Sequence, residues 1–352
     1  MASILPGIRE EFKGVPLLVT NMACSLFDPY PKDDRKNFFD RDELIEDVKK
    51  LVEAKFWPLL VGPKRVGKTS IVKIVTKELD GIYLDASGIS SIRELTSRLI
   101  DRIETLSLSL DIRILKVEVQ RKPVITLEKV LSKLGDRVLG VDEVQNIATP
   151  WLTSVLSTAY NSSDVRFIFT GSMIGMSKVL AGGGKGKSKT IKGRPIVERE
   201  VTPLNLEEGI AFLREGKRRC DVNMTEQEMT DASLTYRGIA GWLTYYGNFR
   251  SLGYDHEKSK EEVEKIALKL VKEEYERLGE IERAVLRGLS LLNSPSWRNL
   301  KKVTEALLGR EVKDWSFTHA LKQLINARVA KKEGENYSLV DPMYRELLKT
   351  GD

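Results

Sequence analysis

The chain has 352 residues, of which 41% are hydrophobic and 31% are charged, and its net charge is +6. This length predicts two or three domains. The composition is that of a soluble protein, without the roughly 18 uninterrupted apolar residues of a membrane span. The N-terminus lacks the basic and apolar regions of a secretory signal, so we expect a cytoplasmic protein with no membrane partner. The two cysteines and two histidines have no metal-type spacing, which argues against a zinc site.

The first predicted helix covers residues 42–52, where apolar residues recur at helical spacing. Phe39 and Arg41 stand immediately before it. They are either ordinary residues of a helix N-terminus or contacts to a ligand of the motif that follows.

A strand, a glycine-bracketed turn and a helix are predicted between residues 59 and 75. The spacing of Gly62, Gly67, Lys68 and Thr69 matches the form G-x-x-x-x-G-K-[ST]. Glycine allows the backbone to direct successive N–H groups inward at the start of a helix, and that geometry binds polyphosphate. The predicted phosphate-binding residues are Gly62, Pro63, Lys64, Arg65, Val66, Gly67, Lys68, Thr69 and Ser70.

The residue types of this loop predict a site for ATP and Mg²⁺. We expect Lys68 to contact the β- and γ-phosphates as a point charge, and the Thr69 hydroxyl to bind the metal. Arg41 and Phe39 would then lie near the nucleotide base. The alternative for the loop is a glycine turn before a basic surface helix.

Further elements alternate between strand and helix. Residues 81–85 predict a second buried strand and residues 92–103 a helix, an order that points to a parallel sheet. Apolar and charged residues partly alternate over residues 110–119, so we expect an inserted hairpin or an extended arm there. Residues 124–134 predict an amphipathic helix.

An apolar strand at residues 137–141 ends in two adjacent acids, Asp142 and Glu143. The carboxyl ends of strands face the ligand crevice in an open parallel sheet, so these acids should lie beside the phosphate-binding loop. Asp142 would hold Mg²⁺, and Glu143 would polarise the attacking water. The alternative is a strand that ends in solvated acids.

A predicted helix at 151–159 and a buried strand at 165–170 lead to Ser172, which is either a sensor of the γ-phosphate or a turn residue. The glycine- and lysine-rich segment 182–192 is either a mobile surface loop or a flap that grips an anion. Arg194 follows it and is a candidate arginine finger at the γ-phosphate.

The remaining chain is mostly helical. Cap-x-x-Glu patterns at Asn205, Thr225 and Ser259 predict helices of a compact lid, with the aromatic residues of 238–247 in its core. Helices at 281–292, 299–308 and 314–327, followed by a hairpin over 329–340, predict a winged helix. Its third helix would turn six polar residues outward: Lys313, Ser316, His319, Lys322, Gln323 and Asn326. These groups would contact either DNA or a protein partner.

The predicted fold class is therefore α/β, with a P-loop NTPase parallel sheet flanked by helices. We expect an ATPase domain over residues 1–203, a helical lid over 204–279 and a winged-helix domain over 280–352.

The order of motifs resembles the archaeal ATPase family of the STAND group, relatives of AAA+ proteins. The resemblance rests on residues 39–44, 62–70, 141–145, 169–172, 193–194 and 337–342. It implies Arg41 near the adenine, Lys68 and Thr69 on phosphate and Mg²⁺, Asp142 and Glu143 as metal and water residues, Ser172 as sensor and Arg194 near the γ-phosphate. The family tends to carry a glycine-proline pair in the lid where this chain has Gly241-Trp242, which weakens the case for a nucleotide contact there.

The sequence as a whole predicts an ATP-binding, slowly hydrolysing switch in which the lid relays the nucleotide state to the winged helix. Protein partners and nucleotide-dependent oligomerisation are compatible with that function. One alternative is a DNA-binding AAA+ ATPase of the replication-initiator type. Another is an interaction adaptor that binds nucleotide with little turnover.

Overall fold

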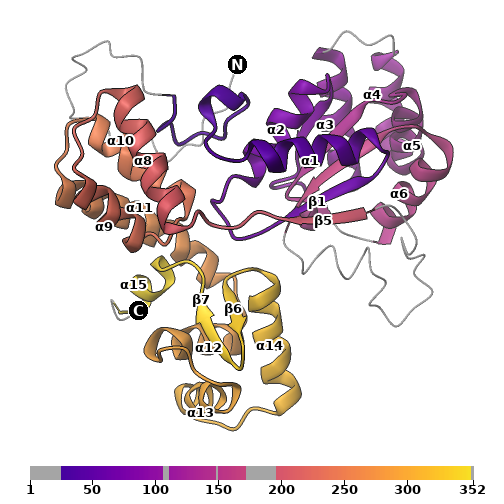
Figure 1. Cartoon of the computed structure of the whole chain (residues 1–352). Coiled ribbons are helices and arrows are strands. Elements are labelled where there is room, and N and C mark those ends of the chain that lie inside the picture. Colours follow the sequence, from indigo (N-terminus) through magenta and orange to yellow (C-terminus); the bar gives the residue numbers. More distant parts are fainter. Residues whose placement is uncertain (1–24, 106–110, 148–149, 172–195, 350–352) are drawn as a thin grey trace.

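The computed structural model describes residues 25–105, 111–147, 150–171 and 196–349. An α/β part, a helical part beside it and a C-terminal part of helices and a hairpin make up the molecule (Figure 1). None of the described helices combines the length and the apolar character that a membrane span requires.

Five parallel strands form the sheet of the α/β part in the order β2-β3-β4-β1-β5. The strands are β1 (Trp57–Val61), β2 (Ile82–Asp85), β3 (Val138–Asp142), β4 (Arg166–Thr170) and β5 (Ile196–Glu200). In the register of the central strands, Leu59 lies opposite Phe169, and Gly140 lies opposite Ile168. Because all strands run the same way, the segments that follow β1, β3 and β4 meet at one edge. The predicted α/β fold class is confirmed.

Alternate side chains of the strands supply two separate apolar cores, one on each face of the sheet. Leu60 and Ile168 pack with α1 (Asp42–Glu53) and α2 (Lys68–Glu78). Leu59 and Phe167 lie on the opposite face. That face is covered by α3 (Ile92–Thr105), α4 (Ile112–Arg121), α5 (Pro123–Lys133) and α6 (Pro150–Ser162).

The expectation of a hairpin or extended arm over residues 110–119 was wrong, because this segment forms α4. Leu115 and Val119 are one helical turn apart and both are buried, while Ile114 and Val117 remain exposed. The Asp111 carboxylate accepts a hydrogen bond from the Ile114 N–H and caps the helix. Apolar residues on both faces of this helix produced the apparent alternation.

The helical part consists of α8 (Leu206–Cys220), α9 (Glu226–Thr235), α10 (Ala240–Ser251) and α11 (His256–Glu276). The predicted capping boxes at Asn205 and Thr225 are present. The predicted start at Ser259 was wrong: Asp255 caps α11, and Ser259 is buried inside the helix. Asp255 offers a carboxylate to the Lys258 N–H at 2.8 Å, and this earlier cap sets the start of the helix.

The Phe27 side chain packs the segment before α1 against the helical part. Its side chain is fully buried and packs edge-to-face on Phe212, with ring centroids 5.6 Å apart. A Cβ atom added to Gly216 would lie 1.8 Å from the Phe27 ring, and one added to Gly247 would lie 2.4 Å from it. Both glycines therefore make room for this ring, and the core of one sheet face continues into the helical part.

The C-terminal part has the predicted order of three helices and a hairpin. Its elements are α12 (Glu280–Leu291), α13 (Trp297–Leu308), α14 (Asp314–Asn326) and the antiparallel strands β6 (Ala330–Glu333) and β7 (Asn336–Leu339). On α14, Phe317 and Leu321 are buried while Lys313, His319 and Lys322 are exposed. A further helix, α15 (Met343–Lys349), was not expected from the sequence and contacts α11 and α12.

Candidate functional site

The loop between β1 and α2 has a backbone that only its glycines allow. Gly62 has φ +155° and Gly67, the cap of α2, has φ +101°. A Cβ atom at Gly62 would lie 2.2 Å from the Val201 carbonyl oxygen, and one at Gly67 would lie 2.9 Å from the Phe38 ring. The positive φ angles and the lack of room for a Cβ atom both exclude residues larger than glycine at positions 62 and 67. The loop therefore ends at the N-terminus of α2 in the arrangement that favours anions.

Lys68 is a buried cation at this helix start. Its Nζ donates hydrogen bonds to the Gly62 carbonyl oxygen, at 3.0 Å, and to that of Pro63. Burial lowers the Lys68 pKa to about 8, although the Glu143 and Asp142 carboxylates favour its charged form. A desolvated ammonium held in this way gains a strong partner when a phosphate oxygen approaches.

The acids at the end of β3 lie in a hydrogen-bonded arrangement with neighbouring strands. Asp142 is buried, and its Oδ2 accepts a hydrogen bond from the Tyr83 hydroxyl at 2.9 Å. Its Oδ1 accepts one from the Thr170 hydroxyl at the end of β4. The pKa of Tyr83 is raised by burial and by the Asp142 charge, so this phenol remains a donor. The Asp142 carboxylate is therefore oriented by hydrogen bonds from the two strands that flank β3.

Glu143 adopts the left-handed backbone conformation, with φ +53°. Its N–H donates to the Thr170 Oγ1 at 3.0 Å, and its carboxylate accepts a hydrogen bond from the Gln145 side chain. An acid held in this uncommon conformation beside a buried lysine is typical of a functional position.

The oxygen-rich residues at this edge fit Mg²⁺. Asp142 supplies a carboxylate and Thr69 a hydroxyl, and Mg²⁺ is usually held by one or two carboxylates together with phosphate oxygens. Among the described residues, no three His, Cys, Asp or Glu side chains gather to hold a metal by themselves. Ser70 is engaged differently, because its Oγ accepts a hydrogen bond from the Lys32 N–H at 3.0 Å.

Other predicted site residues have different positions. Arg41 stands at the start of α1 and donates to the Thr202 carbonyl oxygen at 3.0 Å. Of the two aromatic residues before α1, Phe39 packs on Phe212, with ring centroids 5.6 Å apart, and Phe38 lies against the loop at Gly67. Ser172, the segment 182–192 and Arg194 lie outside the described residues.

A family described as an ATPase domain predominantly from Archaea has a sequence model that matches residues 38–246, more than half of the chain. The chain belongs to this archaeal ATPase family. The predicted membership of an archaeal ATPase family is thereby confirmed, and this membership supports nucleotide binding and ATPase activity. No curated protein sequence matches the chain.

Solved structures resemble this ATPase to different degrees. The Walker-type ATPase PABY2304 of Pyrococcus abyssi has 24% sequence identity and a TM-score of 0.80, covering 92% of this chain and 99% of its own. Cdc6p from Pyrobaculum aerophilum has 12% identity and a TM-score of 0.49, with coverages of 93% and 98%. A STAND protein with a tetratricopeptide repeat sensor, PH0952 from Pyrococcus horikoshii, has 16% identity and a TM-score of 0.40, with coverages of 87% and 42%. The first of these establishes a shared fold.

Arg65, in the phosphate-binding loop of the ATPase, turns toward the helical part. Its guanidinium lies 4.4 Å from the centre of the Trp242 ring, a cation–π contact. Its Nη2 donates to Glu274 Oε1 of α11 at 2.7 Å, and its backbone oxygen accepts from the Gly241 N–H at 2.8 Å. A Cβ atom at Gly241 would lie 2.7 Å from that of Arg65. The lid motif Gly241-Trp242 therefore contacts the loop directly.

The same cluster reaches the C-terminal part. The Trp242 indole N–H lies 3.1 Å from both Asp341 oxygens, and the Tyr344 hydroxyl donates to Glu274 Oε2 at 2.8 Å. Asp341 also stands 3.9 Å from Arg65 Nη1, a buried atom that has no hydrogen-bond partner among the described residues. We call Arg65, Trp242, Glu274, Asp341 and Tyr344 the junction cluster.

Burial and charge act against each other in the junction cluster. Burial alone would raise the pKa of Glu274, but the charges of Arg65 and Lys64 hold that pKa below its usual value. Burial raises the pKa of Asp341, and the opposing effect of Arg65 is smaller. Arg65 therefore stabilises two acids from two different parts of the molecule, the half-buried Glu274 and the buried Asp341.

The roles of Tyr83 and Thr170 and the contacts of the junction cluster were not predicted from the sequence. Thr170 had one available signal, because it is the last residue of a predicted strand and such ends meet the acids of a parallel sheet. Trp242 was expected in the lid core, and it is fully buried. Its contact with Arg65 had no signal in the sequence, since 177 positions separate the two residues.

Proposed function

We propose that this ATPase is a nucleotide-dependent switch whose output is a C-terminal winged helix. The proposal includes the division into an ATPase domain over 1–203, a lid over 204–279 and a winged-helix domain over 280–352. The observation that carries it is the junction cluster, in which a residue of the phosphate-binding loop holds side chains of both other parts.

The proposed chemistry is slow, Mg²⁺-dependent hydrolysis of ATP. Lys68 binds the β- and γ-phosphates, and Asp142 with Thr69 holds Mg²⁺, which would neutralise phosphate charge when bound. Glu143 orients and polarises the attacking water. Two hydrogen bonds hold Glu143 at the strand edge and support this role: its N–H donates to Thr170 Oγ1, and its carboxylate accepts from the Gln145 side chain.

Rearrangement of the loop gives a physical reason for slow turnover. Lys68 must exchange the carbonyl oxygens of Gly62 and Pro63 for phosphate oxygens. Movement of these residues displaces Arg65, which is two positions further along the same loop. A displaced Arg65 leaves the half-buried Glu274 and the buried Asp341 with less compensating charge, and these acids then favour a different arrangement of α11 and α15.

Hydrogen exchange of α15 with and without ATP and Mg²⁺ tests the coupling. The Glu143→Gln protein, expected to bind ATP without hydrolysing it, should change its amide protection in α15 when ATP is added. With Arg65→Gln added, ATP should still bind within a few-fold, and the change in α15 should disappear.

Arg199→Gln is the matched control, since it removes an arginine paired with Asp47 on α1, away from the junction cluster. It should leave the ATP-induced change intact. Unchanged α15 protection upon ATP binding would contradict the coupling while leaving nucleotide binding itself supported.

DNA contact through α14 is the second candidate output. Lys322 on α14 and Lys313 at its N-cap are exposed and form no ion pair among the described residues, so their charges are available to phosphates, whereas His319 Nε2 already lies 2.8 Å from Gln323 Nε2. ATP turnover with and without duplex DNA at low salt checks this role. Stimulation that weakens with salt would favour it, and absence of binding would leave a protein partner as the output.

A further inference from the structure

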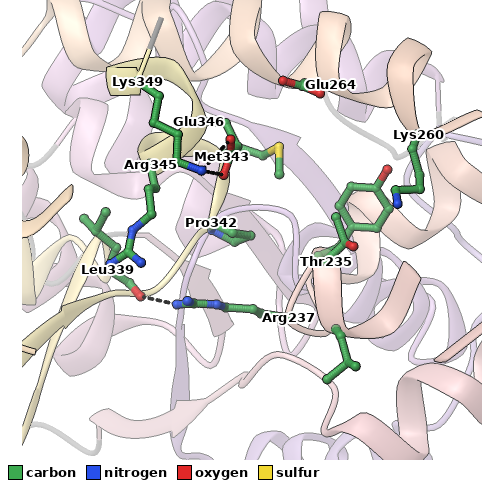
Figure 2. Close-up of a pocket in the computed structure, with 12 residues that line it drawn as sticks. Thr235, Arg237, Lys260, Glu264, Leu339, Pro342, Met343, Arg345, Glu346 and Lys349 are labelled. Atoms are coloured by element: carbon green, nitrogen blue, oxygen red, sulfur yellow. Dashed lines mark hydrogen bonds and ion pairs between the residues drawn. The ribbon is translucent and has the colours of Figure 1, made fainter. Parts of the chain in front are cut away.

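A cavity of about 480 Å³ lies between the helical part and the C-terminal part, away from the phosphate-binding loop. Figure 2 shows its walls, which come from the end of α9, from α11, from the end of β7 and from α15. Its size is that of a small-molecule site. Apolar and aromatic side chains share the lining with charged ones; they include Leu234, Tyr236, Leu339 and Met343.

The charged lining is predominantly basic. Four cations, Arg237, Lys260, Arg345 and Lys349, face the cavity together with two acids, Glu264 and Glu346. Two of the cations already have acid partners: Lys260 lies 2.8 Å from Asp231, and Lys349 lies 2.9 Å from Glu346.

The two arginines retain most of their donors. Arg237 Nη1 donates to the Leu339 carbonyl oxygen at 3.2 Å, and Arg345 Nη1 lies 3.4 Å from Asn293 Oδ1. Neither guanidinium forms an ion pair within the described part of the chain. A guanidinium has five N–H donors in a planar fork that fits phosphate or carboxylate oxygens. Two such forks on one cavity favour an anion with several oxygens.

The backbone that presents Arg237 is also specialised. Arg237 has φ +47°, and Gly238 after it has φ +68°. A Cβ atom at Gly238 would lie 1.7 Å from the Leu204 carbonyl oxygen, so the turn is fixed against the segment that precedes α8. A non-glycine residue kept in this conformation is often found at a ligand site.

The Tyr236 side chain forms part of the cavity wall. Its side chain is 1% exposed, and its hydroxyl has no hydrogen-bond partner among the described residues. A buried hydroxyl without a partner is uncommon, because it loses its hydrogen bonds to water on folding. At this exposure the hydroxyl lies inside the wall rather than on the surface of the cavity, so the ligand contacts must come from other groups of the lining.

We propose that this cavity binds a small organic phosphate, with its phosphate group between Arg237 and Arg345. A phosphate monoester carries a charge of about −1.5 to −2 at neutral pH, which matches the excess of basic groups in the lining. The apolar residues of the lining would contact the organic portion. Binding here is independent of ATP turnover.

The test uses ¹³C-methyl-methionine NMR, because Met343 lines the cavity. The Lys68→Ala background weakens phosphate binding at the loop, and Met343→Leu assigns the signal. Addition of pyrophosphate, and separately of AMP, should shift the Met343 signal saturably, while Met229 in α9 should not shift. AMP should bind more tightly than pyrophosphate, because the cavity also contacts its organic portion.

Combined Arg237→Gln and Arg345→Gln substitutions should weaken this binding at least about tenfold, since charge-assisted hydrogen bonds are lost. Arg298→Gln removes an exposed arginine of α13 outside the cavity and should leave the affinity unchanged. A Met343 signal that does not move at millimolar pyrophosphate or AMP would overturn the proposal. So would equal binding by the double variant, or an equal shift with sodium chloride of the same ionic strength.

Discussion

The two ends of the phosphate-binding loop differ in what their cations contact. Lys68, at the inner end, is buried beside the strand edge and donates to carbonyl oxygens of its own loop. Arg65, three residues earlier, pairs with Glu274 and stacks on Trp242, which belong to the helical part. The same short loop therefore carries Lys68, which lies beside the acids of the strand edge, and Arg65, which contacts the helical part.

This difference shows how a widespread phosphate-binding motif can also carry contacts that are particular to one protein. Phosphate geometry requires the glycines, the lysine and the hydroxyl of the motif, so these positions are fixed by the ligand. The positions between the glycines are free of that requirement. In this chain Lys64 and Arg65 occupy two of them and contact Glu274 instead.

The largest expected effect is on ATP affinity, when each of the two cations is replaced in turn. Lys68→Ala should weaken ATP binding at least about 100-fold, because the loss of one partner of a buried charge pair costs about 3–5 kcal/mol. Arg65→Gln should change ATP affinity only a few-fold. Isothermal titration with ATP and Mg²⁺ measures both. Similar losses in the two variants would mean that Arg65 also serves the nucleotide directly.

A second substitution, at Glu143 beside Lys68, separates ATP binding from ATP hydrolysis. Glu143→Gln should retain ATP affinity and lower steady-state turnover about 100-fold or more, the usual contribution of a general base. Phosphate release measures the rate, and Arg199→Gln serves as a control for loss of a charged side chain elsewhere. Turnover equal to that of the unmodified protein would remove Glu143 from the chemistry and favour the adaptor alternative.

The smallest effect concerns pH. Burial lowers the Lys68 pKa to about 8 in the free protein, and bound phosphates favour the protonated form. ATP affinity should therefore be full below pH 8 and fall as the pH rises through 8, by at most about tenfold per unit. Titrations at pH 7 and pH 9 check this. The residual binding of Lys68→Ala should lack the fall, and a flat profile for the unmodified protein would mean that Lys68 stays charged.

Much of the α/β part was predictable because its signals are local. The apolar run before Gly62, the helical spacing after Thr69 and the acids after Val141 each depend on a few neighbouring residues. The same holds for the capping boxes of α8 and α9. Helix α4 was missed because its apolar residues fit both the alternation of a strand and the spacing of a helix. Only its packing against α3 and α5 distinguishes the two.

The contacts of the junction cluster could not be predicted from neighbouring residues in the sequence. Arg65, Trp242 and Asp341 come from three distant segments, and nothing in the neighbourhood of any one indicates the others. Thr170 and Tyr83 were missed for a related reason, since their contacts with Asp142 depend on the strand order β2-β3-β4. The sequence indicated a parallel sheet without its order.

The insertion of Phe27 between two glycines has a consequence for protein synthesis. This ring emerges early from the ribosome, whereas Gly216 and Gly247, which receive it, are made nearly 200 residues or more later. The sheet face packed under α3 to α6 draws its buried residues from 57–169 and can close early. The opposite core extends as far as Leu347, so a chain truncated near residue 203 would expose Phe27 and its neighbours and tend to aggregate.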